Sequence, residues 1–334
     1  MRSLAVVVPR SEAEAVRRRL LEAGLLDTSF RIGSEGDALL LPVRSRPEGG
    51  WPVREADLEP VRHAPRTYRD VCRVPEALRD LLPTAYDQVG DILLLKLPEP
   101  LLPHAAEVGR ALLEVQANAR VVGVDGGVKG PFRLRDVRLV AGEPRTETVH
   151  REHGVRLHVD VARAYFSPRL GTERLRVARL VRPGETVVDL FSGVGPLALL
   201  IARVAPSATV YAVDANPEAF RALRENVRVN RAGNVRAVLG DAAEFLRGLR
   251  DADRIVLDLP HGASAFLPGA FRSLRRGGTI HLYEILDGGD REARVTGLVA
   301  LGNAEGRPVT VTGIRSVHAY SASQSMFVFD LRVS

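Results

Sequence analysis

Four acidic residues stand at the ends of four consecutive strand-like segments in the second half of the chain. They are Asp189 in ETVVDLF, Asp214 in TVYAVDA, Asp241 in VRAVLGDA and Asp258 in RIVLDLP. The carboxyl ends of parallel strands share one edge of a sheet, and ligands bind in the crevice beyond that edge. A single acid in such a position commonly caps the following helix. Four in succession instead indicate a ligand whose cationic and hydroxyl groups need carboxylates.

A glycine-containing turn follows the first of these strands. Gly193 and Gly195 begin a match to the loose dinucleotide pattern GxGxxA, so a nicotinamide-dependent oxidoreductase is one alternative. Asp189, however, stands four residues before Gly193, where its charge would repel a pyrophosphate and attract the ammonium group of an amino acid. Asp214 suits the ribose hydroxyls of either cofactor, and Asp241 can meet an adenine amino group. The pattern therefore favours S-adenosylmethionine.

The segments around these residues alternate between strand-like and helical patterns from about residue 161 to the end of the chain. Helical segments such as 196–205 and 217–231 separate the strands, and Pro217 fits the first position of the second of them. Alternation at this spacing predicts an α/β domain with a doubly wound parallel sheet over residues 161–334.

Two smaller units are expected before this domain. Residues 1–43 predict a strand at 4–8, a helix at 12–23 and a strand at 38–43. Ser11 and Glu14 fit a capping box at the start of that helix, and Gly24 fits its end. Residues 44–70 are rich in Pro, Gly and charge, which predicts a linker. Residues 71–160 mix a helical pattern with several strand-like runs and predict an α+β domain.

Charge and composition narrow the partners. The 334 residues carry a net charge of +6, and residues 129–182 hold 13 basic and 6 acidic side chains. Such a stretch fits a phosphate backbone, with a solvated charged face as the alternative. Cys72 is the only cysteine, which excludes an internal disulfide framework and a cysteine-based zinc cluster. The histidines lack metal-ligand spacing. Apolar runs shorter than about 20 residues and the lack of a signal-peptide pattern predict a cytoplasmic protein without membrane helices.

A longer signature joins the second and third blocks: AGEPRTETVHREHGVRLHVDVARAYFSPRLGTERLRVARLVRPGETVVDLFSGVGP. With it, the chain resembles the archaeal and eukaryotic tRNA (guanine37-N1)-methyltransferases, and YFSPRLGTER is the most specific segment. GLLDTSFRIGSEGDALLLPV resembles the extra N-terminal domain of the three-domain archaeal form, and SVHAYSASQSMFVFDLRV is similar to the last two strands of the family. The related wybutosine aminocarboxypropyl transferases keep the HREHG portion but lose Pro-Arg-Leu and the following Thr-Glu.

The resemblance implies a class I (Rossmann-like) methyltransferase domain that transfers a methyl group from S-adenosylmethionine to N1 of guanine 37 in the tRNA anticodon loop. It implies Glu173 as the general base and Arg133 as the partner of guanine O6. The cofactor-binding residues that it implies are Arg174, Tyr165, Asp189, Phe191, Gly193, Gly195, Asp214, Asp241, Ala242, Asp258 and Pro260. Tyr165 would stack on the base or the cofactor, with a packed core tyrosine as the alternative. Residues 1–43 would contact the tRNA elbow, and residues 71–160 would form an RNA-binding domain. A monomer without a metal is expected.

Some features leave other interpretations open. Asp258 stands where the family normally has Asn, and His318 and Tyr320 stand in a segment where Lys and Pro are common. Two further interpretations concern the whole chain. One is a wybutosine-pathway transferase acting on the same tRNA position, and the other is a non-catalytic tRNA-binding protein.

The two residues expected to act on guanine also have simpler structural interpretations. Glu173 could pair with Arg169 or Arg176, which lie one helical turn away. Arg133 and Arg135 share one face of a predicted strand, which would also suit phosphate binding.

Overall fold

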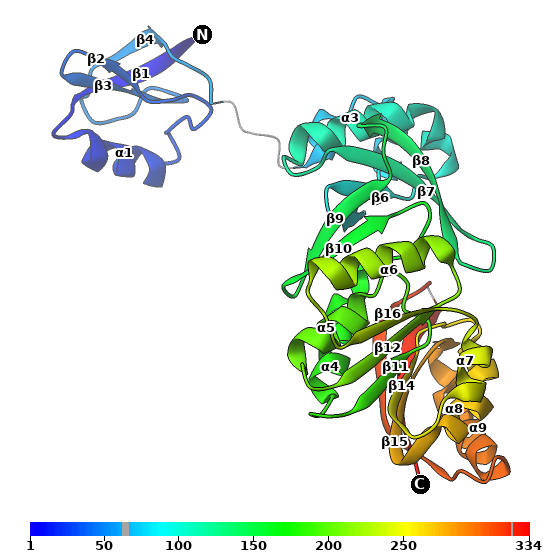
Figure 1. The fold of residues 1–334 in the computed structure, drawn as a ribbon. Helices are drawn as coiled ribbons and strands as arrows, with labels where there is room; N and C mark the ends of the chain where they lie inside the picture. The colour runs from blue at the N-terminus through cyan, green and yellow to red at the C-terminus, as the bar shows by residue number, and fades with distance from the viewer. Residues whose placement is uncertain (62–66, 322) are drawn as a thin grey trace. The chain divides into compact units, whose positions relative to one another are not determined.

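The computed structural model describes residues 1–61, 67–321 and 323–334. These residues form two compact units, Met1–Asp70 and Val71–Ser334 (Figure 1). Residues 62–66 of the predicted linker, and residue 322 between the last two predicted strands, lie outside the described part.

The first unit is a four-stranded antiparallel sheet with one helix packed on it. The strand order is β2-β3-β1-β4, with bounds Arg2–Pro9 for β1, Gly33–Glu35 for β2, Ala38–Pro42 for β3 and Val53–Asp57 for β4. Helix α1, Ala13–Glu22, buries Val16 and Leu20 against Val6, Val8 and Leu41. The predicted strand at 4–8, helix at 12–23 and strand at 38–43 are therefore confirmed as β1, α1 and β3.

Two predictions for this unit are wrong. Residues 44–70 are not only a linker, because β4 pairs with β1 over five residues and completes the sheet. Ser11 does not cap α1: the N-cap position is Glu12, which makes no side-chain cap hydrogen bond, and Glu14 pairs with Arg17 instead. Gly24, at φ +68°, follows the helix end as expected.

The second unit begins with a small sheet of order β5-β6-β7-β8, on which helix α3, Ala105–Val115, packs. The bounds are Asp87–Val89 for β5, Ile92–Leu95 for β6, Val121–Lys129 for β7 and Leu134–Gly142 for β8. Short helices precede α3: α2 at Tyr68–Val71 and the 3-10 turns at Glu76–Leu81 and Glu99–His104. The predicted pair of strands after β8 is confirmed as the hairpin β9–β10, Glu147–Glu152 and Val155–Asp160. Helix α6 spans Pro217–Val229, and Asn230 is its C-cap residue. The side chains of Asn226 and Asn230 form hydrogen bonds with the backbone of β10 and so join this hairpin to the larger sheet.

The larger sheet has the order β13-β12-β11-β14-β15-β17-β16. The strands are Thr186–Asp189 (β11), Thr209–Asp214 (β12), Val235–Leu239 (β13), Ala252–Leu257 (β14), Leu274–Asp287 (β15), Val309–Ala319 (β16) and Gln324–Val333 (β17). The prediction of a Rossmann-like α/β fold is confirmed, but the prediction of a parallel sheet is wrong for β17. β17 runs antiparallel to both β15 and β16, because a connection of a few residues can join β16 and β17 only as a hairpin.

Helices cover both faces of this sheet (Figure 1). Helices α4 (Gly171–Leu180), α5 (Pro196–Val204) and α6 pack into one core, and α7 (Ala242–Gly248), α8 (Leu267–Ser273) and α9 (Arg291–Ala304) pack into the other. Gly195 lies at the start of α5 with φ +86°, and a Cβ there would collide with the Leu223 side chain. The turn after β11 can therefore enter α5 at Pro196 only with glycine at position 195.

Candidate active site

A cavity of about 380 Å³ opens at the carboxyl edge of β11, β12 and β14. Eleven of the thirteen predicted site residues line it: Arg133, Tyr165, Glu173, Arg174, Asp189, Phe191, Gly193, Asp214, Asp241, Asp258 and Pro260. Gly195 and Ala242 do not line it; Gly195 shapes the turn behind it, and Ala242 is the first residue of α7. The volume lies in the range of small-molecule sites.

Three of the strand-end acids, the buried Asp189 and the half-buried Asp214 and Asp258, form a carboxylate cluster in one wall of the cavity. Burial raises the pKa of Asp189 to about 8, and repulsion by the nearby Asp258 carboxylate is the second cause of this shift. Burial also raises the pKa of Asp258 to about 6, although Arg174 and Arg133 oppose the shift. Burial raises the pKa of Asp214 as well, against hydrogen bonds from the backbone N–H groups of Asn216 and Gly193.

This cluster fits a cationic ligand. No cationic side chain in the described part of the chain pairs with Asp189, Asp214 or Asp258 within 4.0 Å. Buried carboxylates need a positive partner to stay ionised, and S-adenosylmethionine carries both an ammonium and a sulfonium group. The residues present therefore fit that cofactor. Asp241 accepts hydrogen bonds from the N–H groups of Ala243 and Glu244, so it caps α7 while it lines the cavity.

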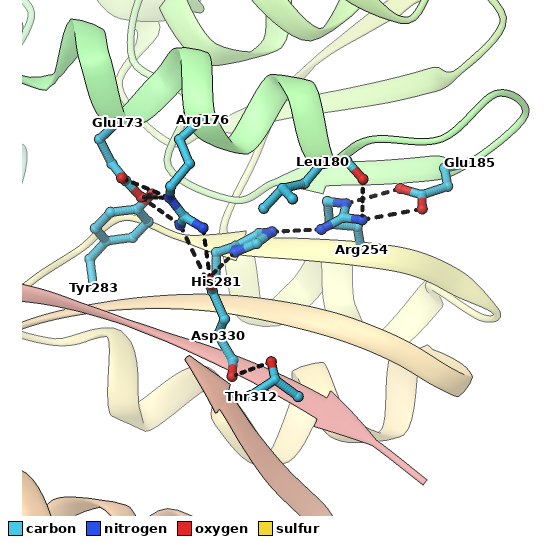
Figure 2. Close-up of polar contacts among 9 residues, drawn as sticks. All are labelled: Glu173, Arg176, Leu180, Glu185, Arg254, His281, Tyr283, Thr312 and Asp330. Atoms are coloured by element: carbon cyan, nitrogen blue, oxygen red, sulfur yellow. Dashed lines mark hydrogen bonds and ion pairs between the residues drawn. The ribbon is translucent and has the colours of Figure 1, made fainter. Parts of the chain in front are cut away.

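Glu173 lies in the first turn of α4 with its buried carboxylate at the cavity (Figure 2). The Arg176 guanidinium donates from Nε to Oε1 and Oε2, at 3.0 and 2.9 Å, and from Nη2 to Oε1 at 2.7 Å. The Tyr283 hydroxyl donates to Oε1 at 2.9 Å. The anticipated pairing with Arg176 is thus present, whereas Arg169 pairs with Asp87. Oε1 accepts three hydrogen bonds and Oε2 only one, so Oε2 is the oxygen with a lone pair left for a proton.

Arg133 lies in the turn between β7 and β8, not on a strand. It has φ +54° and immediately precedes β8, so the expected shared strand face with Arg135 is wrong. Its guanidinium carbon lies 5.4 Å from the centroid of the Tyr165 ring. Tyr165 is 36% exposed and lines the cavity, which contradicts a packed core tyrosine.

Buried ion pairs hold the segments on either side of this ring. Arg135 pairs with Asp125 and Asp87 and donates to the Phe166 carbonyl at 3.2 Å, which ties β8 to the segment before α4. Arg174 donates from Nη1 to both oxygens of Glu152 and from Nη2 to the Ser167 carbonyl. Its contact with a cofactor carboxylate stays a prediction.

The structure also reveals site residues that the sequence did not indicate. Tyr283 and Ile285 of β15, Asn216 after β12 and Met326 of β17 line the cavity, as do His318 and Tyr320. The alternation in TIHLYEI places Tyr283 and Ile285 on one face of their strand, which is the only local signal for either. His318 and Tyr320 stood out only as departures from the family pattern.

More than half of the basic side chains at 129–182 form ion pairs with acidic residues of the same chain. Seven of its thirteen basic side chains form ion pairs: Lys129, Arg135, Arg145, Arg163, Arg169, Arg174 and Arg176. Net charge along the sequence therefore overstates the positive surface left for phosphates. Among the described residues, no group of three or more His, Cys, Asp or Glu side chains could hold a metal ion. Within the same residues, no helix is long and apolar enough to cross a membrane.

Comparisons with known proteins identify the family of the chain. The family model of the TRM5/TYW2 methyltransferase domain matches residues 148–296, that of the TYW2 N-terminal domain residues 71–146, and that of the tRNA methyltransferase 5 N-terminal domain residues 5–50. The tRNA (guanine(37)-N(1))-methyltransferase Trm5b of Pyrococcus abyssi is 43% identical over 334 residues, 99% of each chain.

Two solved structures extend the comparison. The complex of aTrm5 with tRNALeu is 29% identical and covers 99% of this chain and 100% of that chain, with a TM-score of 0.84. The M. jannaschii TYW2 in complex with AdoMet is 25% identical and covers 75% of this chain and 99% of that chain, with a TM-score of 0.59. With its fold, its cavity and a full-length relative in agreement, the chain belongs to the Trm5 family of tRNA (guanine(37)-N(1))-methyltransferases.

Proposed function

We propose that this protein transfers the methyl group of S-adenosylmethionine to N1 of guanine 37 in the tRNA anticodon loop. The observation that carries the proposal is the placement of Glu173 at the same cavity as the carboxylate cluster and Arg133. A proton acceptor, a fixed cation and a wall for a cationic methyl donor thus face one space. Full-length similarity to Trm5b supports the same function.

The reaction needs a base because guanine N1 carries a proton at neutral pH. The bound cofactor supplies an electrophilic methyl group on a sulfonium. Glu173 Oε2 takes the N1 proton while Oε1 stays held by Arg176 and Tyr283, which fixes the direction of the carboxylate. As the proton leaves, negative charge spreads to guanine O6. The Arg133 guanidinium, which cannot lose its own proton, stabilises that charge.

Tyr165 provides a platform for the target base. Its half-exposed ring lies at the cavity beside Arg133 and Arg135, and aromatic rings stack on bases with little regard to sequence. A base in a single-stranded loop enters such a pocket at less cost than a base in a duplex.

Mass spectrometry of nucleosides from tRNA treated with the enzyme and S-adenosylmethionine tests the proposal. We expect 1-methylguanosine and its loss when guanine 37 is replaced. Aminocarboxypropyl transfer is a second candidate, because the TYW2 N-terminal model matches residues 71–146. The larger aminocarboxypropyl mass increment on tRNA would establish that reaction instead. Glu173 favours methyl transfer, since the base is needed for N1.

We expect the unit Met1–Asp70 to add tRNA affinity from a site remote from the cavity, such as the tRNA elbow. It has its own apolar cores, and removal of residues 1–61 ends before α2, so we expect the second unit to stay folded. We expect unchanged binding of S-adenosylhomocysteine and at least tenfold weaker binding of full-length tRNA, as for loss of a tethered module. Equal tRNA binding and methylation by the shortened and full chains would contradict this. That the protein acts as a monomer in the cytoplasm stays a prediction.

Asp258 is expected to support the cofactor rather than to accept the guanine proton. It belongs to the carboxylate cluster, and Glu173 already presents a free lone pair. An Asp258→Asn variant should keep at least a tenth of the wild-type single-turnover rate, and Asp258→Ala should mainly weaken cofactor binding. Single-turnover rates and equilibrium binding of S-adenosylhomocysteine separate the two effects. If Asp258→Asn abolished transfer while Glu173→Gln did not, the base would be Asp258.

A further inference from the structure

A chain of buried and half-buried polar side chains connects Glu173 to residues of the sheet (Figure 2). Arg176 bridges two carboxylates. Its guanidinium holds Glu173 on one side, and on the other it donates to Asp330 from Nη1 at 2.8 Å and from Nη2 at 3.2 Å. Asp330 comes from β17, which lies 154 residues further along the chain.

His281 of β15 fixes the far side of Asp330. The Arg254 guanidinium lies 2.7 Å from His281 Nε2, and because arginine can only donate, Nε2 must be the acceptor. The ring proton is therefore on Nδ1, which donates to Asp330 Oδ1 at 2.6 Å. Burial lowers the pKa of His281, so the ring is neutral at pH 7. Arg254 is itself held by Glu185 and the Leu180 carbonyl.

Asp330 stays ionised in this arrangement. Although burial opposes the shift, the hydrogen bond from His281 and the pair with Arg176 lower the pKa of Asp330 to about 2. The Arg176 guanidinium is thus shared by two carboxylates, Glu173 and Asp330, while the charge of Arg254 is balanced by Glu185. When Glu173 takes up a proton, Arg176 still has an ionised partner, and no buried charge is left unpaired.

We propose that Asp330, held by His281, is a positioning residue that acts through Arg176 to keep Glu173 both correctly oriented and basic enough to accept the guanine proton. Without the Asp330 charge, Glu173 would be the only counter-charge of the half-buried Arg176 guanidinium. Protonation of Glu173 would then leave that guanidinium without an ionised partner, which is costly where water is largely excluded. The inference rests on the proposed role of Glu173 as the base.

The groups that face Glu173 define what else could alter its protonation. In the described part of the chain, Arg176 from its own helix and Tyr283 from β15 donate to it, Asp258 after β14 lies near it, and Arg133 and Arg174 line the same cavity. Burial and the Glu173 carboxylate raise the pKa of Tyr283, so its hydroxyl remains a donor. Arg176 is the cation that contacts this carboxylate, since Arg174 pairs with Glu152, so Arg176 and its partner Asp330 act on it most directly.

Asp330→Asn tests the proposal, in the wild-type and in the Glu173→Gln background. In the wild-type background we expect a roughly tenfold lower single-turnover rate at neutral pH, and the acid limb of the pH profile should move about one unit lower. In the Glu173→Gln background we expect no further loss, because the residue through which Asp330 acts is gone. Arg176→Lys, which places one ammonium between two carboxylates, should show the same non-additivity.

Asp253→Asn is the matched control. Asp253 also pairs with an arginine, Arg275, and its side chain is 17% exposed against 20% for Asp330, but it lies at the start of β14, away from the cavity. It should leave the rate unchanged in both backgrounds. A rate within threefold of wild type for Asp330→Asn, or an equal loss in both backgrounds, would overturn the inference. If Glu173→Gln itself kept the wild-type rate, the proposed base would fail regardless of Asp330.

Discussion

A Glu173→Gln variant is expected to bind the cofactor and tRNA normally and to lose at least about 10²-fold in the single-turnover rate of methyl transfer. Glutamine has nearly the same shape, but its amide cannot accept the N1 proton. The fold should survive, because Arg176 keeps its ion pair with Asp330 and is not left without an ionised partner. Rates are measured with saturating tRNA and S-adenosylmethionine, and cofactor binding with S-adenosylhomocysteine.

Glu152→Gln provides a comparison for this result. Glu152 is another buried acid that pairs with an arginine, Arg174, near the cavity. Loss of that pair should disturb binding of the cofactor more than the chemical step. A Glu173→Gln rate within about threefold of wild type would contradict the assignment of the base.

An Arg133→Ala variant is expected to lose about 10²-fold in the same rate, since a single donor to a developing oxyanion is worth 10²–10³-fold. Arg133→Lys should recover part of the loss, because an ammonium keeps the charge but not the planar fork of donors. Both substitutions leave a non-glycine residue at φ +54°, so the backbone effect cancels in the comparison.

Arg138 separates catalysis from phosphate binding in this experiment. It is an exposed arginine on β8, five residues beyond Arg133. If Arg133 only contacted phosphates, Arg133→Ala and Arg138→Ala would both weaken tRNA binding in a salt-dependent way and spare the rate at saturating tRNA. That outcome would remove Arg133 from the chemical step.

The sequence predicted the part of the site that depends on local periodicity. The acids at 189, 214, 241 and 258 follow strands of a regular βα alternation, and that alternation alone brings them to one edge. The same reasoning failed at β4, because VREAD is short, charged and surrounded by Pro and Gly, so its composition resembles a linker. Pairing with β1, rather than any local preference, makes it a strand.

The supports of the catalytic side chains were beyond prediction from local pattern. Tyr283 meets Glu173 across 110 residues of sequence, and Asp330 meets Arg176 across 154. The second contact depends on β17 inserting between β15 and β16, and periodicity does not specify the order of strands in a sheet. Arg133 was placed on a strand for a related reason, since alternation does not show where a turn with positive φ ends.

The carboxylate cluster couples cofactor binding to the acidity of the medium. With a pKa raised by burial to about 8, Asp189 is mostly protonated at pH 7 before a cation arrives. A cationic ligand favours the ionised carboxylate, so its binding releases a proton to solvent. By linkage, affinity then rises by up to about tenfold per pH unit below 8 and levels off above it. The heat of binding measured in a calorimeter therefore includes the protonation enthalpy of the buffer, and occupancy by the methyl donor depends on pH.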